Sequence, residues 1–339
     1  MNVQARTLVI VNPASARARR AWPKIKDALT VAEIGFDMYE TTHAGDATER
    51  TRAALLDGYN LIAVVGGDGT LSEAASGFFQ FHQNDDHANF HLPSPINREA
   101  ALALLPAGTG DDFARGLMGE RETLAKWLEI FISYCRRGDD AMSAARLVDV
   151  IHGRVEHGEQ DFICLNVATI GLGAEVAARV ASQGNVMRHL PGEARFVSAA
   201  CGALAAWRER RVRVTVDESE VIESQTNLIA IANGIYAGGG MMFAPGARND
   251  DGLLDLLLSR DLTRATILRE LPRIRRGEHL ANERVRILQA RHVRVETETP
   301  EDALLIEADG NVRGHTPAEF HIMPGAIRII QNAKLKMEN

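Results

Sequence analysis

Two patterns of apolar positions alternate along the first 140 residues. Short continuous apolar runs are typical of strands buried on both faces of a parallel sheet. They predict strands at residues 7–11, 61–65 and 101–105, and we expect a further strand at 36–42. Apolar residues that recur every three or four positions predict helices over residues 22–34, with Pro23 in the first turn, and over 47–56, 70–79 and 123–137. The alternation predicts a parallel sheet covered by helices on both faces.

The second half of the chain has a different pattern. Short β-patterned runs separated by glycine-rich turns predict an antiparallel sandwich or barrel-like domain. The runs are residues 146–151, 162–170, 212–216, 228–232, 253–258, 293–296, 304–307 and 326–330, with helices expected near 193–210 and 263–276. We therefore predict two domains, residues 1–140 and 141–330, and a tail, 331–339, that can pack back on the first. Residues 82–99 are expected to be a polar surface insertion.

Composition and charge exclude several classes of protein. The net charge of -7 excludes a strongly basic nucleic-acid binder as the first hypothesis. The three cysteines, Cys135, Cys164 and Cys201, lack the spacing of a disulfide framework or a zinc site. The first apolar run is too short for a signal peptide, so we expect a cytoplasmic protein. The histidines His43, His189, His279, His315 and His321 show no paired spacing, so we expect surface or structural roles for them.

The most informative segment is LIAVVGGDGT, residues 61–70. A buried strand that ends in glycines and opens a helix presents bare backbone N–H groups to an anion, which predicts a phosphate-binding turn. Asp68 could hold Mg²⁺ or orient a hydroxyl nucleophile, and Thr70 could cap the helix and contact a phosphate oxygen. The alternative is a glycine-rich turn in which Asp68 is only a helix cap.

Other polar turns follow the neighbouring strands. They are Asn12-Pro13-Ala14-Ser15, Thr41-Thr42 and residues 106–112, PAGTGDD. Because ligands of open α/β sheets bind outside the carboxyl ends of the strands, we expect these turns to converge on one nucleotide site. No Gly-Lys-Ser/Thr occurs, which excludes an ordinary P-loop ATPase. Gly171-Leu172-Gly173 is only a weak indication of a dinucleotide fingerprint.

The motifs GGDGT, NP-x-S and PAGTGDDFARGL together resemble the diacylglycerol kinase catalytic family, in particular bacterial soluble lipid kinases of the YegS/DgkB type. The second half agrees through NVATIGLGA at 166–174, ANG at 232–234, GGG at 238–240 and DGLLD at 251–255. The resemblance implies an α/β N-terminal domain with a parallel sheet, as in NAD kinases and diacylglycerol kinases, and a C-terminal antiparallel β-sandwich. GGDGT alone is shared with NAD kinases and phosphofructokinases.

The resemblance also implies site residues. ATP would contact Asn12, Ser15, Thr41, Thr42, Gly66, Gly67, Asp68, Gly69, Thr70, Gly108 and Thr109. Mg²⁺ would be held by Asp251 with the carbonyls of Arg248 and Leu253. The catalytic base of the family lies in an Asp-Gly-Glu motif, which here is Asp309-Gly310-Asn311, and an amide cannot accept the proton. A second departure, Asp111-Asp112 in place of Asn-Asp, adds a negative charge near the phosphates.

The expected function is transfer of the γ-phosphate of ATP to a hydroxyl of a diacylglycerol-like lipid. Phosphoryl transfer depends mostly on positioning and charge neutralisation, so Asp309 could replace the missing base while Asp68 aligns the γ-phosphate. The alternatives are a degenerate homologue that binds nucleotide or lipid without turnover, as Asn311 suggests, and a kinase of NAD or another soluble metabolite. We expect a lipid alcohol as substrate, transient contact with a membrane surface and no nucleic-acid partner. The sequence leaves open whether the chain forms a homodimer.

Two helical segments bear on lipid access. Residues 263–276 carry Ile267, Leu268, Leu271 and Ile274 among arginines, which fits either a membrane surface or ordinary packing, and Pro272 weakens the helix. Phe196, Ala200, Leu204 and Trp207 have helical spacing, for which core packing is the expected role and a mobile flap the alternative.

Overall fold

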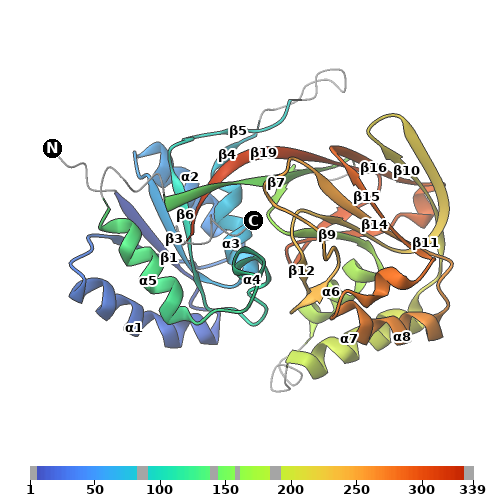
Figure 1. Cartoon of the computed structure of the whole chain (residues 1–339), viewed down its shortest axis with the longest axis horizontal. Helices are drawn as coiled ribbons and strands as arrows, with labels where there is room; N and C mark the ends of the chain where they lie inside the picture. The colour runs from blue at the N-terminus through green and yellow to red at the C-terminus, as the bar shows by residue number, and fades with distance from the viewer. Residues whose placement is uncertain (1–5, 82–90, 138–143, 157–160, 184–191, 332–339) are drawn as a thin grey trace. The chain divides into compact units, whose positions relative to one another are not determined.

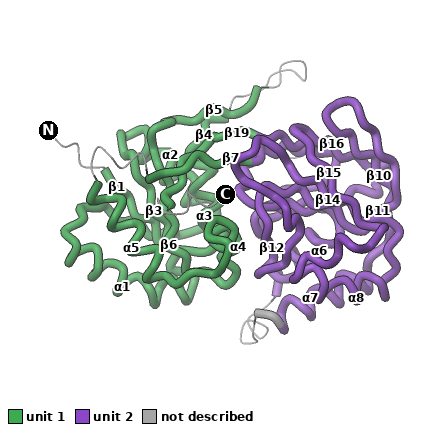
Figure 2. Tube along the Cα trace, in the orientation of Figure 1, with its two compact units in different colours: residues 1–150, 323–339 green, residues 151–322 purple. Residues whose placement is uncertain are grey.

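The computed structural model describes residues 6–81, 91–137, 144–156, 161–183 and 192–331. The chain forms two compact units, a first unit of residues 1–150 and 323–339 and a second unit of residues 151–322 (Figure 2). The chain leaves the first unit within strand β7 (Ala145–Val155) and returns to it within strand β19 (Ala318–Ile330). The division differs from the predicted domains because residues 141–150 and 323–330 belong to the first unit.

The first unit is built on a parallel sheet in the order β6-β3-β1-β2 (Figure 1). Its strands are β1 (Thr7–Val11), β2 (Asp37–Glu40), β3 (Leu61–Gly66) and β6 (Ala101–Pro106). The end of β19 adds a further parallel strand, with Arg328 opposite Ala101. A short hairpin, β4 (Phe79–Gln80) and β5 (Ser94–Pro95), borders residues 82–90, so most of the predicted polar insertion lies outside the described residues.

Five helices accompany this sheet. They are α1 (Ala16–Val31), α2 (Asp46–Leu56), α3 (Asp68–Ser76), α4 (Asp112–Met118) and α5 (Leu124–Cys135). Because β2 and β3 lie on opposite sides of β1, right-handed crossovers put α1 on one face of the sheet and α2 and α3 on the other. The connections from β1 and β3 therefore leave in opposite directions, which makes the carboxyl ends of these two strands the switch point of the sheet.

Three helix starts in the first unit differ from the predictions. Helix α1 begins at Ala16, because Ser15 caps it by accepting from the amide of Ala18, so Pro23 lies inside the helix. Helix α3 begins at Asp68 with Gly67 as its N-cap, so Thr70 is not the cap. Helix α4 was not predicted at all. The predicted stop of the last helix, Gly138, lies outside the described residues.

The second unit is antiparallel throughout its described ladders, as predicted. One path of strands is β18-β17-β9-β11-β10-β16-β19, and β14 pairs with both β11 and β15. The strands are β9 (Val167–Gly171), β10 (Arg210–Val216), β11 (Glu220–Ala232), β14 (Leu254–Arg260), β15 (Val285–Ala290), β16 (His292–Thr297), β17 (Leu305–Ala308) and β18 (Asn311–His315). Two short strands, β12 (Tyr236–Ala237) and β13 (Met241–Met242), form a separate hairpin.

The predicted strand at 162–170 is two strands. Strand β8 (Phe162–Cys164) pairs with β7, and β9 follows after a break at Leu165 and Asn166. Helix α6 (Leu172–Ser182) begins directly after β9 and was not predicted. The break matters because both residues take part in the hydrogen bonds described below.

The two remaining helices pack against the second unit. Helix α7 (Gly192–Ala206) leads to Trp207, and Ala200, Leu204 and Trp207 are buried in the main core, which confirms core packing. Helix α8 (Arg264–Ile274) continues through Pro272 to its end two residues later. It buries Ile267 and Ile274 and leaves Leu268 exposed, so most of its apolar face serves packing. None of the helices in the described ranges combines the length and apolar character needed to cross a bilayer.

Candidate functional site

The turn after β3 touches the turn after β6 through two glycines. A Cβ on Gly67 would lie 3.0 Å from the Cα of Gly108, and a Cβ on Gly108 would lie 2.5 Å from the Cα of Gly67. Such distances are below normal van der Waals contact, so the two backbones can approach only because both residues lack a side chain. A Cβ on Gly66 would likewise lie 2.9 Å from that of Thr70. Gly67 and Gly108 therefore allow close packing of backbone on backbone, and Gly66 leaves room for the side chain of Thr70.

Asn12, directly after β1, links this turn to the switch point. Its Nδ2 donates to Oγ1 of Thr70 at 2.8 Å, and its Oδ1 accepts from the amide of Ala14 at 3.0 Å. The hydroxyl of Ser15 donates to the carbonyl of Ala107 at 3.1 Å. The turns after β1, β3 and β6 thus converge, as the sequence predicted.

The turn after β2 lies beside them. The amide of Thr41 donates to the carbonyl of Val11 at 2.9 Å. Both hydrogen-bond donors of Thr42 already have a partner, because its amide and its hydroxyl donate to Asp46 at 2.7 and 2.9 Å. Burial acts to raise the pKa of Asp46, but the bonds from Thr42 and Tyr39 outweigh it and the pKa is lowered. The hydroxyl of Thr41 also donates to the carbonyl of Val11, at 3.5 Å, so contact of either threonine with ATP stays a prediction.

Asp68 holds the start of helix α4. Its two carboxylate oxygens accept from the amides of Asp112 and Phe113, each at 3.1 Å. Burial, followed by the charge of Asp112, raises the pKa of Asp68 to about 7. This carboxylate at the helix N-terminus was not predicted, and it explains why α4 begins immediately after the glycine turn. Contact of Asp68 with Mg²⁺ or a nucleophile stays a prediction.

The extra negative charge expected at Asp111 is offset locally. Asp111 has a left-handed backbone, with φ of 50°, and its Oδ1 accepts from the amide of Gly108 at 2.8 Å. Its Oδ2 lies 3.2 Å from Nη2 of Arg121, which also donates to the carbonyl of Thr109 at 3.1 Å. A left-handed conformation favours Asn or Asp, so the aspartate keeps the turn that an asparagine would form.

Two arginines at this site were missed from the sequence. Arg17 donates from Nη1 to the carbonyl of Gly108 at 2.6 Å and is exposed. Arg121 bonds the same turn through Asp111 and Thr109. The available signal was the arginine-rich segment directly after Ser15, since cations beside a phosphate-binding turn neutralise the ligand.

In the second unit, Asp309 and Gly310 form the two-residue turn between β17 and β18. Both have positive φ, 48° and 87°, and Ala308 pairs with Asn311 across the turn. Positive φ at both central residues is the type I′ arrangement for which Asp-Gly is a preferred sequence. The Asp-Gly of the late motif is thus a hairpin turn, and this dipeptide between two β-patterned runs is the sequence signal for it.

The carboxylate of Asp309 accepts four hydrogen bonds from the β8–β9 break. Leu165 donates its amide to Oδ2 at 2.7 Å, and Oδ1 accepts from Cys164, Asn166 and Val167 at 3.1–3.3 Å. The break is also held by the ANG motif, because the amide of Asn233 donates to the carbonyl of Asn166 at 2.8 Å. Three motifs that are far apart in sequence therefore meet within the second unit.

Glu307 is a second carboxylate at the β17–β18 turn, and the sequence did not single it out. It is buried, accepts from the hydroxyl of Thr169 at 2.8 Å, and also accepts from the amide of Gly310. Burial raises the pKa of Glu307 to about 7, although these hydrogen bonds act against the shift. Asn311 follows in the same turn, and its Nδ2 has no hydrogen-bond partner among the described residues.

The predicted cation-binding turn lies before β14. Asp251 is exposed and its Oδ1 accepts from the amide of Leu253 at 3.0 Å. Asp255 is buried, its Oδ2 has no partner within the described residues, and burial together with Asp251 raises its pKa to about 6. The buried orphan oxygen of Asp255 beside a second carboxylate fits a hard cation, and binding of Mg²⁺ by Asp251 with the carbonyls of Arg248 and Leu253 stays a prediction.

Comparison with known proteins agrees with this architecture. The sequence-family model of the diacylglycerol kinase catalytic domain matches residues 6–144. The family model of the YegS C-terminal NAD kinase beta sandwich-like domain matches residues 168–331. A diacylglycerol kinase of Bacillus subtilis (strain 168) is 26% identical over 93% of this chain and 92% of its own length. The crystal structure of a putative diacylglycerol kinase from Bacillus anthracis shares the fold, with a TM-score of 0.69 and 24% identity over 96% of this chain and 97% of that one.

A higher identity comes from a probable YegS-like lipid kinase of Chromohalobacter salexigens. It is 31% identical over 95% of this chain and 91% of its own length. Both halves of the chain thus match the two-domain arrangement that the sequence motifs indicated. The chain belongs to the family of bacterial diacylglycerol kinases and YegS-like lipid kinases.

Proposed function

We propose that this chain transfers the γ-phosphate of ATP to a hydroxyl of a diacylglycerol-like lipid. The observation that carries the proposal is the convergence of the turns after β1, β3 and β6 at the switch point of a parallel sheet, where Gly67 lies against Gly108 and Asn12 bonds Thr70. Such a turn presents amides to a phosphate without side chains in the way. The family supports a lipid as the acceptor rather than a soluble metabolite.

The residues that support nucleotide binding have distinct roles in this proposal. The amides of Gly66 to Thr70 contact phosphate oxygens, Gly108 lines the site with its own amide bonded to Asp111, and Thr41 lies at the edge of the site. Arg17 and Arg121 neutralise phosphate charge, since guanidinium groups bind phosphate oxygens well. Mg²⁺, when bound, would supply further neutralisation of the phosphates. Asp68 contributes by fixing α4 against the glycine turn.

Glu307 is the proton acceptor that we propose in place of the missing glutamate. A general base works best when its pKa lies near the operating pH, and the pKa of Glu307 is about 7. Asp309, by contrast, already accepts four hydrogen bonds, so it is better suited to positioning the turn. The proposal predicts that Glu307→Gln lowers kcat more than it changes KM for ATP.

Transfer of labelled phosphate from ATP to lipid alcohols in mixed micelles tests the proposed function. The purified full chain is expected to label at least one of diacylglycerol, monoacylglycerol and a long-chain alcohol, in a reaction that requires a divalent cation. Absence of transfer to every lipid, with ATP binding intact, would contradict the proposal. Labelling of NAD but of no lipid would replace it by a metabolite kinase.

Asn311 favours one second candidate, a homologue that binds nucleotide or lipid without turnover. An amide in the family's base position cannot accept a proton. The variant Asn311→Glu separates the two candidates. A silent wild type that gains transfer on this substitution would support the degenerate homologue, whereas an active wild type that is little changed would support catalysis with Asn311 in place.

A further inference from the structure

We propose that His292, Glu319 and His321 form a binding site for a transition-metal dication such as Zn²⁺. The site lies in the second unit, on strands β16 and β19, and it is separate in composition from the oxygen-rich turn that suits Mg²⁺. The sequence predicted only a surface or structural role for His321, because its partner lies 29 positions away along the chain.

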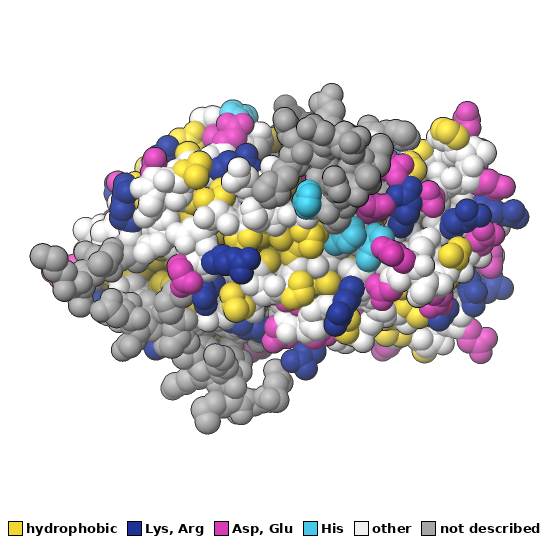
Figure 3. Space-filling model, turned by 90° about the horizontal axis from the view of Figure 1, so that it is seen from above, with side chains coloured by type: hydrophobic (Ala, Val, Ile, Leu, Met, Phe, Trp, Pro, Cys, Tyr) yellow, Lys and Arg dark blue, Asp and Glu magenta, His cyan; other side chains and the backbone are white. Residues whose placement is uncertain are grey.

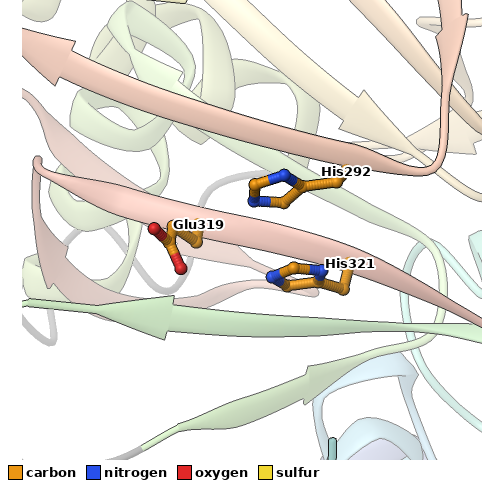
Figure 4. A group of neighbouring side chains, drawn as sticks. All are labelled: His292, Glu319 and His321. Carbon is orange, nitrogen blue, oxygen red and sulfur yellow. The ribbon is translucent and has the colours of Figure 1, made fainter. Parts of the chain in front are cut away.

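Strand pairing brings the three side chains together. Strands β16 and β19 are antiparallel, and His292 lies directly opposite His321. Glu319 precedes His321 by two positions, so both project from the same face of β19. One ligand atom from each of the three side chains lies within 4.8 Å of the others. Figure 4 shows the two imidazole rings one above the other, with the carboxylate beside them.

The distances allow an ion after small side-chain movements. Tetrahedral Zn²⁺ has ligands at roughly 2.0–2.1 Å, which places the ligand atoms about 3.4 Å apart. The side chains would therefore need to close by up to about 1.5 Å. The rings are now stacked, with centroids 4.1 Å apart and planes 13° apart. Because the nitrogen lone pairs lie in the ring planes, binding must rotate the rings out of this stack, and all three side chains are only partly buried.

The hydrogen bonding of His292 favours a metal. Neither ring nitrogen of His292 has a hydrogen-bond partner among the residues the structure describes. Polar atoms that are buried without partners are rare and usually have a ligand or water. The imidazole nitrogen is among the commonest metal ligands in proteins.

The surrounding charge also favours a dication. Arg294 lies opposite Glu319 on β16 and bonds the carboxylates of Glu319, Glu296 and Glu156. Three carboxylates around one guanidinium leave an excess of negative charge beside the two imidazole rings. Figure 3 shows histidine side chains at the surface next to acidic and basic ones. A histidine and carboxylate ligand set selects Zn²⁺ or a similar ion over Mg²⁺.

Titration of the tag-free, chelator-treated full chain with ZnCl₂ and CoCl₂ tests the site. We expect one equivalent to bind by calorimetry, Co²⁺ to give the visible absorption bands of a tetrahedral complex, and Zn²⁺ to raise the thermal unfolding temperature. MgCl₂ at the same concentration should reproduce none of these effects. Removal of outer-shell partners alone costs about 10–100-fold in metal affinity, so His292→Asn and Glu319→Gln should each weaken binding at least 10-fold.

His315→Asn is the matched control, since His315 is an exposed histidine of the second unit that lies on β18. It should bind metal as the wild type does. If His292→Asn fails to fold by circular dichroism, Glu319→Gln carries the comparison, because it keeps the size of the side chain. No binding by the wild type, or binding that is unchanged in Glu319→Gln and in any folded His292→Asn, would overturn the site.

Discussion

Gly67 and Gly108 set how closely the turns after β3 and β6 can approach. Their Cα atoms lie in positions where an added Cβ would meet the other backbone at 3.0 Å or less. The neighbouring contacts, from Asn12 to Thr70 and from Ser15 to Ala107, then close the site around the glycines. The candidate phosphate site therefore depends on the absence of a side chain at both Gly67 and Gly108.

Replacement of Gly108 by alanine should disrupt this packing. A Cβ 2.5 Å from the Cα of Gly67 forces the turns apart, and overpacking of this kind costs about 1–3 kcal/mol. We expect ATP affinity, measured by calorimetry, to fall at least about tenfold as the amides move. Gly116→Ala in helix α4 is the control, because no atom lies within 4 Å of its added Cβ. Equal effects of the two substitutions would contradict the packing argument.

Asp111→Asn tests whether the ion pair with Arg121 restrains that arginine. Asparagine keeps the left-handed turn and the acceptor for the amide of Gly108 but releases Arg121. Since Arg121 is partly exposed, we expect the stability to change by less than about 1 kcal/mol. The KM for ATP should fall, because one negative charge leaves the site. A rise in KM would show that Asp111 helps nucleotide binding directly.

Glu307 should make stability fall as the pH rises. Its pKa is raised from 4.5 to about 7, chiefly by burial, so the folded protein binds this proton more tightly than the unfolded chain. The resulting stabilisation is present below the unfolded pKa and is lost as the pH rises through about 7. Glu307→Gln should flatten the decrease in the free energy of unfolding between about pH 5 and 7.5, as denaturant titrations would show. An unchanged slope would contradict a raised pKa of the buried Glu307 carboxyl.

Among the elements, helix starts were the least predictable features and the ones that build the site. The apolar period of α1 begins at Trp22, but the helix begins six residues earlier at Ala16, because Ser15 supplies a cap and the first turns are exposed arginines. Helix α4 is short, and its start depends on Asp68, which is 44 positions away. The local periodicity of apolar residues reveals neither the hydrogen bond to the cap of α1 nor the distant carboxylate at the start of α4.

Ser15 allows a comparison of two caps. Ser15→Ala and Thr123→Ala each remove the side chain that caps a helix, of α1 and of α5, and each should cost about 1 kcal/mol. Only Ser15 also donates to the carbonyl of Ala107. We therefore expect only Ser15→Ala to weaken ATP binding at a similar loss of stability in thermal unfolding. A parallel loss of ATP affinity in Thr123→Ala would mean that the effect is global.

At the scale of the whole molecule, the buried strands and the change from parallel to antiparallel sheets could be predicted from sequence. Continuous apolar runs such as Leu61–Gly66 fit few structures other than a buried strand. The boundary between the units could not be predicted, because β19 pairs with β16 at one end and with β6 at the other. For the same reason the pair His292 and His321, and the bonds of Asp309 to the β8–β9 break, become visible only in the structure.

We propose above all that the turns after β1, β3 and β6 bind the phosphates of ATP. A crystal structure of the full chain with Mg²⁺ and a non-hydrolysable ATP analogue tests it most directly. We expect phosphate oxygens within hydrogen-bond distance of the amides of Gly66 to Thr70, with Arg17 turned from its carbonyl partner toward the nucleotide. A nucleotide bound elsewhere, with this glycine turn empty, would contradict it.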